Sequence, residues 1–335
     1  MNIAFVDFWP SPRPFDVSNN FFVHALRACA EGIEVVDPEH CDVLFYGPFG
    51  DEHRRYRDCL KIFYTGENIL PDFDNCHAAL SFSPDHYGGR NLRLPLWNLY
   101  IDWFGVKSYG NPEWLVPLEW LTQEKVGDFA AAPKQNFCAI VYGKPIQSRL
   151  EAIATLSEYK SVDVLGKANP LAPIADGEWA KLQALSRYRF SLCYENSIAP
   201  GYHTEKLLHG KIAGGIPIYF GHQTVELDFN PRCYVQAVDL TSSELTERVR
   251  EIDADPRLYC QLASEPLFVQ TPDIAALCET LYGFIKHQPR IALACNRRVP
   301  YQLARLKRYR RDRWVFVKRT LRYWLRHLRL RRQQA

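Results

Sequence analysis

The residues best suited to chemistry gather in the stretch CYENSIAPGYHTEKLLHG, residues 193–210. An acid and an amide follow an apolar, strand-like run, and a tyrosine, a second acid and a lysine surround the start of a helical pattern: Glu195, Asn196, Tyr202, Glu205 and Lys206. A purely structural interpretation is available, in which Thr204 caps the helix, Glu205 favours the positive end of its dipole and Lys206 is solvated. The alternative interpretation is a binding site for an anion.

The chemistry that this stretch favours is recognition of a nucleotide-sugar. Pro200-Gly201 lets the chain turn tightly from the strand into the helix. The first turn of a helix presents free N–H groups and a positive dipole end, for which phosphate is the usual guest. Lys206 would add a full charge, and Glu195 or Glu205 could hold sugar or ribose hydroxyls. A nucleotide-sugar would use every one of those groups.

Motifs for other nucleotide sites do not occur in the sequence, which has neither a P-loop nor a G-x-G-x-x-G that follows a strand. Two D-x-D strings, Asp72-Phe73-Asp74 and Asp253-Ala254-Asp255, could ligate a divalent metal beneath a diphosphate. Capping of a helix at Pro256 explains the second string, and the first follows Pro71 in a turn. We therefore predict no metal site, and keep a metal-dependent transferase that uses Asp72 or Asp74 as an alternative.

The elements that must position these residues alternate between strand and helix patterns. In the first third of the chain the alternation runs through residues 2–8, 19–32, 33–37, 42–49, 60–68 and 77–83. It resumes through residues 136–143, 146–159, 161–166, 177–188, 189–196, 204–214, 216–221 and 233–240. This order is typical of doubly wound α/β folds, which bind ligands beyond the carboxyl ends of their strands. Two such units would enclose a cleft.

The length of 335 residues also predicts more than one domain, because single cores seldom grow beyond about 250 to 300 residues. We place the link at residues 111–135, where prolines interrupt the alternation. The first predicted domain is residues 1–130, on the side of the molecule that would accept the sugar. The second is residues 131–295, which would bind the nucleotide-sugar, and a basic tail follows at 296–335. Residues 243–290 are expected to form helices on the second domain.

Composition indicates a folded protein of the reducing cytoplasm. Apolar residues make up 47% and charged residues 24%, and no apolar run reaches the roughly 18 residues of a membrane span. The first residues, MNIAFVDFWPSPRPFD, are typical of a buried strand and not of a signal peptide. The ten cysteines form no C-x-x-C pair, and Cys138 and Cys193 lie inside apolar runs, where free thiols behave as small hydrophobic groups.

The basic character of the chain belongs to its tail. Residues 301–335 hold 13 Lys and Arg and one acid, a net charge of +12, whereas residues 1–300 carry 28 bases and 37 acids, a net charge of −9. One face of a helix would carry the apolar residues Trp314, Val317, Leu321, Trp324 and Leu328. An anionic membrane surface is the expected partner, with nucleic acid as the rival. We therefore expect a peripheral protein on the inner face of the cytoplasmic membrane.

Longer motifs resemble the α-1,3-fucosyltransferase family. They are FYTGENILPDFDNCHAALSF at 63–82, RNLRLPLW at 90–97, and YRFSLCYENSIAPGYHTEKLLHGKIAGGIPIYFGHQTVELDFNPRCYV at 188–235, with NFCAIVYG, Arg149 and YKSVDVLGK between them in the family's order. The resemblance covers about residues 1 to 240. It implies a GT-B fold of two Rossmann-like domains, GDP-fucose as donor, inversion at the sugar carbon and no required cofactor.

The resemblance also implies roles for single residues. Glu67 matches the family's proposed general base, although a capped loop acid is the structural alternative. Arg149 and Lys206 match diphosphate ligands, where a surface helix arginine is the alternative for Arg149. The remaining donor-side positions are Asn196, Tyr202 and Glu205, and candidates near the acceptor are Asn91, Arg93 and Trp97. For that last group, a structural arginine and a core tryptophan are the more ordinary interpretations.

The sequence departs from the family pattern at three places. The turn after the strand at 136–143 is Tyr142-Gly143-Lys144, Leu165-Gly166 replaces a paired glycine, and His203 stands where small or aliphatic residues are common. The predicted function is transfer of L-fucose from GDP-fucose to a hydroxyl of a β-galactosyl-GlcNAc-type glycan acceptor, on a bacterial surface glycolipid such as lipopolysaccharide. A non-catalytic glycan-binding protein is the alternative from another class.

Overall fold

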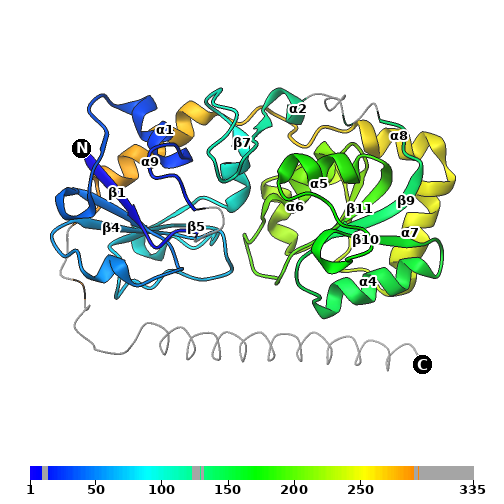
Figure 1. Ribbon diagram of the computed structural model, residues 1–335. Coiled ribbons are helices and arrows are strands. Elements are labelled where there is room, and N and C mark those ends of the chain that lie inside the picture. The colour runs from blue at the N-terminus through cyan, green and yellow to red at the C-terminus, as the bar shows by residue number, and fades with distance from the viewer. Residues whose placement is uncertain (10–13, 123–128, 130–131, 290–292, 294–335) are drawn as a thin grey trace. The chain divides into compact units, whose positions relative to one another are not determined.

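The computed structural model describes residues 1–9, 14–122, 129, 132–289 and 293 (Figure 1). Within this part of the chain, two separate parallel sheets are each accompanied by helices. The tail that the sequence assigns to a membrane surface lies outside the described residues. Every described helix is too short or too polar to span a bilayer.

The first sheet has the strand order β2-β1-β3-β4-β5-β6, and every pair is parallel. Its strands are β1 (Asn2–Val6), β2 (Glu34–Val35), β3 (Val43–Tyr46), β4 (Leu60–Tyr64), β5 (Ala78–Ser81) and β6 (Asn91–Arg93). Alternate residues face opposite sides, so Ile3 and Phe5 join one buried cluster while Ala4 and Val6 join another. This double burial explains the nearly continuous apolar runs of the sequence.

Two helices pack together beside this sheet, α1 (Phe21–Cys29) and α9 (Ile274–Lys286). Asn20 caps α1 by accepting a hydrogen bond from the N–H of Val23, at 3.1 Å. Figure 1 shows α9 alongside α1, although the two are more than 240 residues apart. The prediction that all helices of residues 243–290 lie on the second domain is therefore wrong for α9. Its Cys278, Leu281 and Ile285 join the core that contains α1, and a local pattern cannot tell which sheet will cover such a face.

The second sheet has the strand order β10-β9-β11-β12-β13, again parallel throughout. Its strands are β9 (Asn136–Val141), β10 (Val162–Leu165), β11 (Tyr188–Tyr194), β12 (Ile216–Phe220) and β13 (Val235–Gln236). Its helices are α4 (Gln147–Ser157), α5 (Glu178–Leu185), α6 (Glu205–Ile212), α7 (Ser242–Ala254) and α8 (Pro256–Ser264). Each strand and helix expected between residues 136 and 240 is thus confirmed.

The helices of this second unit divide between the two faces of its sheet. Phe190 and Leu192 of β11 join the cluster of α4 and α7, whereas Cys193 joins that of α5 and α6. α6 packs very close to β11, because a Cβ on Gly210 would lie 2.3 Å from the sulfur of Cys193. The expected role of Cys138 and Cys193 as small buried free thiols is confirmed.

Short elements connect the two sheets. A 3-10 helix, Leu96–Tyr100, follows the first sheet, and then come the paired strands β7 (Ile101–Asp102) and β8 (Val116–Pro117) and the helix α2 (Glu119–Thr122). The chain also returns to the first sheet through α9. The domain boundaries drawn from the sequence remain a prediction.

Candidate active site

A buried carboxylate stands at the carboxyl end of β11. Glu195 is 1% exposed and accepts hydrogen bonds from the backbone N–H of Thr204 (2.8 Å) and from the Thr204 hydroxyl (2.8 and 3.0 Å). The ammonium of Lys206 donates to the same carboxylate at 3.0 Å. These bonds compensate the cost of burying the charge, and they fix the start of α6 against the end of β11.

The helix that begins here is not capped in the way the structural interpretation predicts. Thr204 occupies the N-cap position, but its side chain makes no cap hydrogen bond. Its hydroxyl donates to Glu195 and accepts from Lys206 at 2.8 Å. No side-chain acceptor from Thr204 therefore occupies the first N–H groups of α6, and a helix end of this kind attracts an anion.

Lys206 is a cation held by carboxylates. Burial alone would lower the pKa of Lys206, but the charges of Glu195 and Glu205 and the hydrogen bond that Lys206 donates to Glu195 outweigh burial, so the pKa lies above its ordinary value. Glu205 lies 3.9 Å from the same ammonium. Burial would raise the pKa of Glu205, yet the charges of Lys206 and Lys181 bring it down to about 2. Both groups are therefore charged at neutral pH.

Arg149 is a second buried cation of the site. It is 4% exposed, so the alternative of a surface helix arginine is wrong. Its guanidinium donates to the carbonyls of Lys144 (3.0 Å) and Tyr194 (2.6 Å) and to the side-chain oxygen of Asn196 (2.8 Å). Burial lowers the pKa of Arg149 and the charge of Glu195 opposes that shift. The carbonyl and amide partners are neutral, so Arg149 keeps its full charge for an incoming anion.

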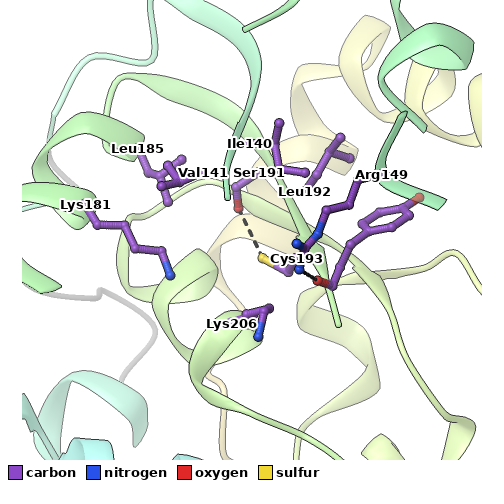
Figure 2. A pocket seen from close by; sticks show the side chains of 10 residues that line it. Ile140, Val141, Arg149, Lys181, Leu185, Ser191, Leu192, Cys193 and Lys206 are labelled. Atoms are coloured by element: carbon purple, nitrogen blue, oxygen red, sulfur yellow. Dashed lines mark hydrogen bonds between the residues drawn. The ribbon is translucent and has the colours of Figure 1, made fainter. Parts of the chain in front are cut away.

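Arg149 and Lys206 line a pocket that is open to solvent (Figure 2). Ten residues from β9, α4, α5, β11 and α6 line it: Ile140, Val141, Arg149, Lys181, Leu185, Ser191, Leu192, Cys193, Tyr194 and Lys206. In the view of Figure 2, Lys181 and Arg149 stand on different sides of the pocket. Sequence reasoning missed Lys181. The available signal is that Lys181 and Leu185, one helical turn apart, place a lysine on the apolar face of α5.

The loop between β11 and α6 approaches the first domain very closely. Gly201 has a φ of +78°, and a Cβ there would lie 2.1 Å from the carbonyl oxygen of Phe82. Only glycine fits, because the backbone is left-handed and the neighbour is backbone. Tyr202 is 2% exposed and packs edge-to-face on Phe82, with ring centroids 5.2 Å apart. The tight turn expected at Pro200-Gly201 is confirmed. It brings the loop between β11 and α6 against Phe82, which follows the end of β5.

The loop after β4 reaches the same place from the first domain. The amide of Asn68 donates to the hydroxyl of Ser197 at 2.6 Å. The neighbouring Glu67 is exposed, and its carboxylate makes no hydrogen bond to a residue that the structure describes. Its charge nevertheless acts on Tyr202, whose pKa burial raises well above the ordinary value with help from Glu195 and Glu67. Glu67 thus lies beside the loop between β11 and α6, with its side chain exposed to solvent.

Two of the three acceptor-side candidates lie in contacts between the domains. Arg93 donates to both carboxylate oxygens of Asp228, at 2.7 Å each, and Asp228 also contacts the buried ring of His203. His203, which departs from the family pattern, is therefore part of a hydrogen-bonded cluster between the domains. Trp97 is 7% exposed and packs on Phe229, with ring centroids 5.2 Å apart. Because these side chains are committed to packing and ion pairing, the ordinary interpretations fit both residues.

Asn91 is also engaged internally. It is 3% exposed, accepts from the Ser81 hydroxyl at 2.8 Å and donates to the carbonyls of Ser83 (3.1 Å) and Asp85 (2.9 Å). Its amide therefore holds the loop between β5 and β6. The structure brings together Glu67, Arg149, Asn196, Tyr202, Glu205 and Lys206, and leaves Asn91 and Trp97 outside that group. Arg93 contacts the loop between β11 and α6, because its guanidinium donates to the carbonyl of Gly201 at 3.4 Å.

The two D-x-D strings serve local structure. Asp72 accepts from the N–H of Asp74 at 3.3 Å and from the amide of Asn75 at 3.0 Å. Asp255 caps α8 at Arg257 and Leu258, which confirms the capping interpretation, and Asp253 pairs with Lys160 and Arg189. No cluster of three or more His, Cys, Asp or Glu that could hold a metal occurs among the described residues.

Comparison with known proteins identifies the family. The model of the α-(1,3)-fucosyltransferase FucT N-terminal domain matches residues 3–100, and that of the glycosyltransferase family 10 (fucosyltransferase) C-terminal region matches residues 132–264. The Helicobacter pylori α-(1,3)-fucosyltransferase FucT is 26% identical over 249 residues, 68% of this chain and 52% of that protein. Bos taurus α-(1,3)-fucosyltransferase 4 is 33% identical over 117 residues, 34% of this chain and 29% of that protein. The chain thus spans about half the length of the first relative and less of the second.

Solved structures show the same fold. The crystal structure of an α1,3-fucosyltransferase superimposes with a TM-score of 0.67 at 20% identity, over 86% of this chain and 91% of that one. Crystal structures of α1,3-fucosyltransferase with GDP and with GDP-fucose give TM-scores of 0.65 at 21% identity. The fold is therefore GT-B, with two Rossmann-like domains. With both family models matched in order across the two sheets, the chain belongs to the α-1,3-fucosyltransferase family.

Proposed function

We propose that this protein is an inverting α-1,3-fucosyltransferase that moves L-fucose from GDP-fucose to a hydroxyl of a β-galactosyl-GlcNAc-type glycan. The observation that carries the proposal is the meeting of two loops. One loop, between β11 and α6, leads to Lys206 in the first turn of α6 and contacts Arg149 of α4 through Asn196, and both cations line a pocket. The other loop carries the exposed carboxylate of Glu67. Family membership and a similar α1,3-fucosyltransferase solved with GDP-fucose support the choice of donor.

The donor-side residues are suited to a leaving diphosphate. When the bond from the anomeric carbon to the β-phosphate oxygen breaks, negative charge grows on that oxygen. Lys206, Arg149 and the first N–H groups of α6 already stand in fixed positions to receive it, and such preorganised charge costs no rearrangement during the reaction. Glu205 and Asn196 are the proposed contacts to sugar or ribose hydroxyls, and Tyr202 forms the wall toward the first domain.

The acceptor-side step needs a base. As the acceptor oxygen bonds to the anomeric carbon, its proton passes to the carboxylate of Glu67, and the electron pair of the broken bond leaves with GDP. A positioned general base typically contributes about 10²- to 10⁴-fold in rate. The exposed position of Glu67 leaves room for a glycan to approach. Attack from the face opposite the leaving group produces inversion.

The acceptor and the cellular location are part of the same proposal. The glycan belongs to a bacterial surface glycolipid of the lipopolysaccharide type. The enzyme works at the inner face of the cytoplasmic membrane, held there by residues 301–335. The net charge of +12 and the tryptophan-leucine face of that segment support an anionic lipid surface as the partner.

A thermal-shift comparison of nucleotides tests the donor class first. We expect GDP to raise the melting temperature saturably, because a ligand that binds only the folded state stabilises it by mass action. UDP and ADP should have little effect. If UDP shifts the melting temperature and GDP does not, the donor assignment is wrong.

A transfer assay tests the reaction. GDP-fucose and N-acetyllactosamine should yield a fucosylated trisaccharide, and we expect the yield to survive EDTA because protein cations face the diphosphate. Activity that EDTA abolishes and a divalent cation restores would favour the metal-dependent alternative instead. GDP binding without any transfer would favour the non-catalytic one.

A further inference from the structure

Lys181 is a third cation at the pocket, and neither the family motifs nor the sequence analysis assigned it a role. It lies on α5 and lines the pocket together with Arg149 and Lys206 (Figure 2). Its ammonium lies 3.2 Å from Nδ1 of His209, which belongs to α6. Among the described residues this is the one hydrogen bond of its side chain, and no carboxylate pairs with it directly.

The chemical state of His209 follows from this contact. An ammonium can only donate, so Nδ1 must accept and the ring hydrogen must sit on Nε2. Burial and the charge of Lys181 lower the pKa of His209 to about 3, so the ring is neutral in the physiological range. His209 is 2% exposed, and its Nε2 has no hydrogen-bond partner in the described part of the chain. The ring therefore orients Lys181 without neutralising it.

The residues that line the pocket carry three positive charges, on Arg149, Lys181 and Lys206, and no carboxylate. The carboxylates of Glu195 and Glu205 lie beside Lys206 but are not among the lining residues. Glu195 is already engaged by Lys206 and Thr204. Burial lowers the pKa of Lys181, and the charges of Glu205 and Glu178 oppose that shift. A ligand with negative charge would meet three cations in this pocket.

We propose that Lys181 binds an oxygen of the diphosphate of the sugar donor, and that His209 is a positioning residue that holds its ammonium toward the pocket. This inference rests on the proposed function, since it concerns the same donor. It adds a third ligand to Arg149 and Lys206, contributed by a different helix. A lysine suits the role because its ammonium acts as a point charge with three donors.

Titration of the wild type and of Lys181→Met with GDP, GMP and guanosine tests the proposal. We expect the Kd of the full-length protein for GDP to rise at least about tenfold, as for loss of one hydrogen bond to a charged group. The loss should be smaller for GMP and absent for guanosine, because the latter has no phosphate. Lys181→Arg should retain most GDP affinity, and His209→Phe should lose less than Lys181→Met because the ammonium remains.

Lys160→Met is the matched control. Lys160 precedes β10 at its amino end, opposite to the pocket, and pairs with Asp253. The Lys160→Met substitution should leave the affinities for GDP, GMP and guanosine unchanged. Should Lys181→Met fail to fold, Lys181→Gln, a neutral side chain that can still donate to His209, is titrated in its place.

Two results would overturn the inference. One is unchanged GDP affinity in a folded, neutral Lys181 variant, and the other is an equal loss for GDP and guanosine, which indicates a structural role. Neither result contradicts the assignment of GDP-fucose as donor, because that assignment is tested by nucleotide binding to the wild-type protein. Absence of GDP binding by the wild type is the separate outcome that contradicts the proposed function.

Discussion

The loop from β11 to α6 and the loop after β4 meet at the candidate site, and they differ in how firmly the fold holds their carboxylates. The loop from β11 to α6 holds its carboxylate at 1% exposure, with hydrogen bonds to Thr204 and Lys206. The loop after β4 leaves Glu67 exposed, without a hydrogen bond to any described residue. One charge is fixed before any ligand arrives, and the other is left in water.

This difference matches the chemistry proposed for each side. A diphosphate is bound best by charges that do not have to reorganise, so the energetic cost of burial is met during folding. A general base must instead be able to take and return a proton, which an exposed carboxylate does easily. Removing the base should therefore affect turnover, and removing the fixed charge should affect binding and stability.

Glu67→Gln should have the largest effect. The amide keeps the size and polarity of the side chain but cannot accept the proton, so turnover should fall by at least about a hundredfold. The Kd for GDP and the melting temperature should remain unchanged, because Glu67 supports no described hydrogen bond with its side chain. Steady-state kinetics, titration of GDP and a melting curve measure the three quantities.

Glu39→Gln is the control for this substitution, since Glu39 is an exposed acid in the 3-10 helix Pro38–His40, which leads into the amino end of β3. It should leave turnover intact. If Glu67→Gln loses nucleotide binding but retains nearly normal turnover at saturation, the roles assigned to the two loops are exchanged or wrong.

Lys206→Ala should have the next largest effect, and it should act on binding. Loss of a charge-assisted contact to phosphate should raise the Kd for GDP about 10- to 100-fold. It should also lower the free energy of unfolding by about 1–3 kcal/mol, because Glu195 would lose a partner inside the protein. GDP titration and urea denaturation separate the two effects. Unchanged stability with weakened binding would show that Thr204 alone satisfies Glu195.

The sequence could predict the donor side because its information is local. The strand, turn and helix around residues 193–210 follow one another in the chain, so Pro200-Gly201 and the helix start could be placed from pattern alone. Even so, the partner of Thr204 could not be predicted. Whether its hydroxyl bonds to the helix or to Glu195 depends on tertiary geometry.

The features that the sequence could not predict depend on contacts between segments that are distant in the chain. Arg93 ends β6 and Trp97 lies in the 3-10 helix that follows it, but their partners Asp228 and Phe229 lie more than 130 residues later. The same limitation applies to α9 and to the contact between Lys181 and His209, which forms only because α6 packs beside α5. Long-range pairing of this kind has no signature in a single sequence.

Asp228→Asn should have a moderate effect that depends on pH. Burial would raise the pKa of Asp228, but hydrogen bonds from Arg93 and His203 outweigh it, so the folded pKa lies below the ordinary value. The stabilisation by this carboxylate is therefore complete above its unfolded pKa of about 3.9, and is lost as the pH falls through the folded pKa. Melting curves should show the variant less stable by about 2 kcal/mol at pH 7, with the difference narrowing below about pH 4. A difference that is constant with pH would mean that the charge is not responsible.

Deletion of residues 301–335 should have the smallest effect on the site. It removes a net charge of +12 and the apolar face of Trp314, Leu321 and Trp324, but none of the residues that surround the pocket. The remaining chain should fold and bind GDP with unchanged affinity, while losing its binding to anionic vesicles in a sedimentation assay. Binding of the wild type should weaken with added salt, because the attraction is screened within about 8 Å at physiological ionic strength. Vesicle binding that persists after deletion would contradict the membrane role. A sharp fall in melting temperature would instead show that the tryptophan-leucine face is packed against the rest of the protein.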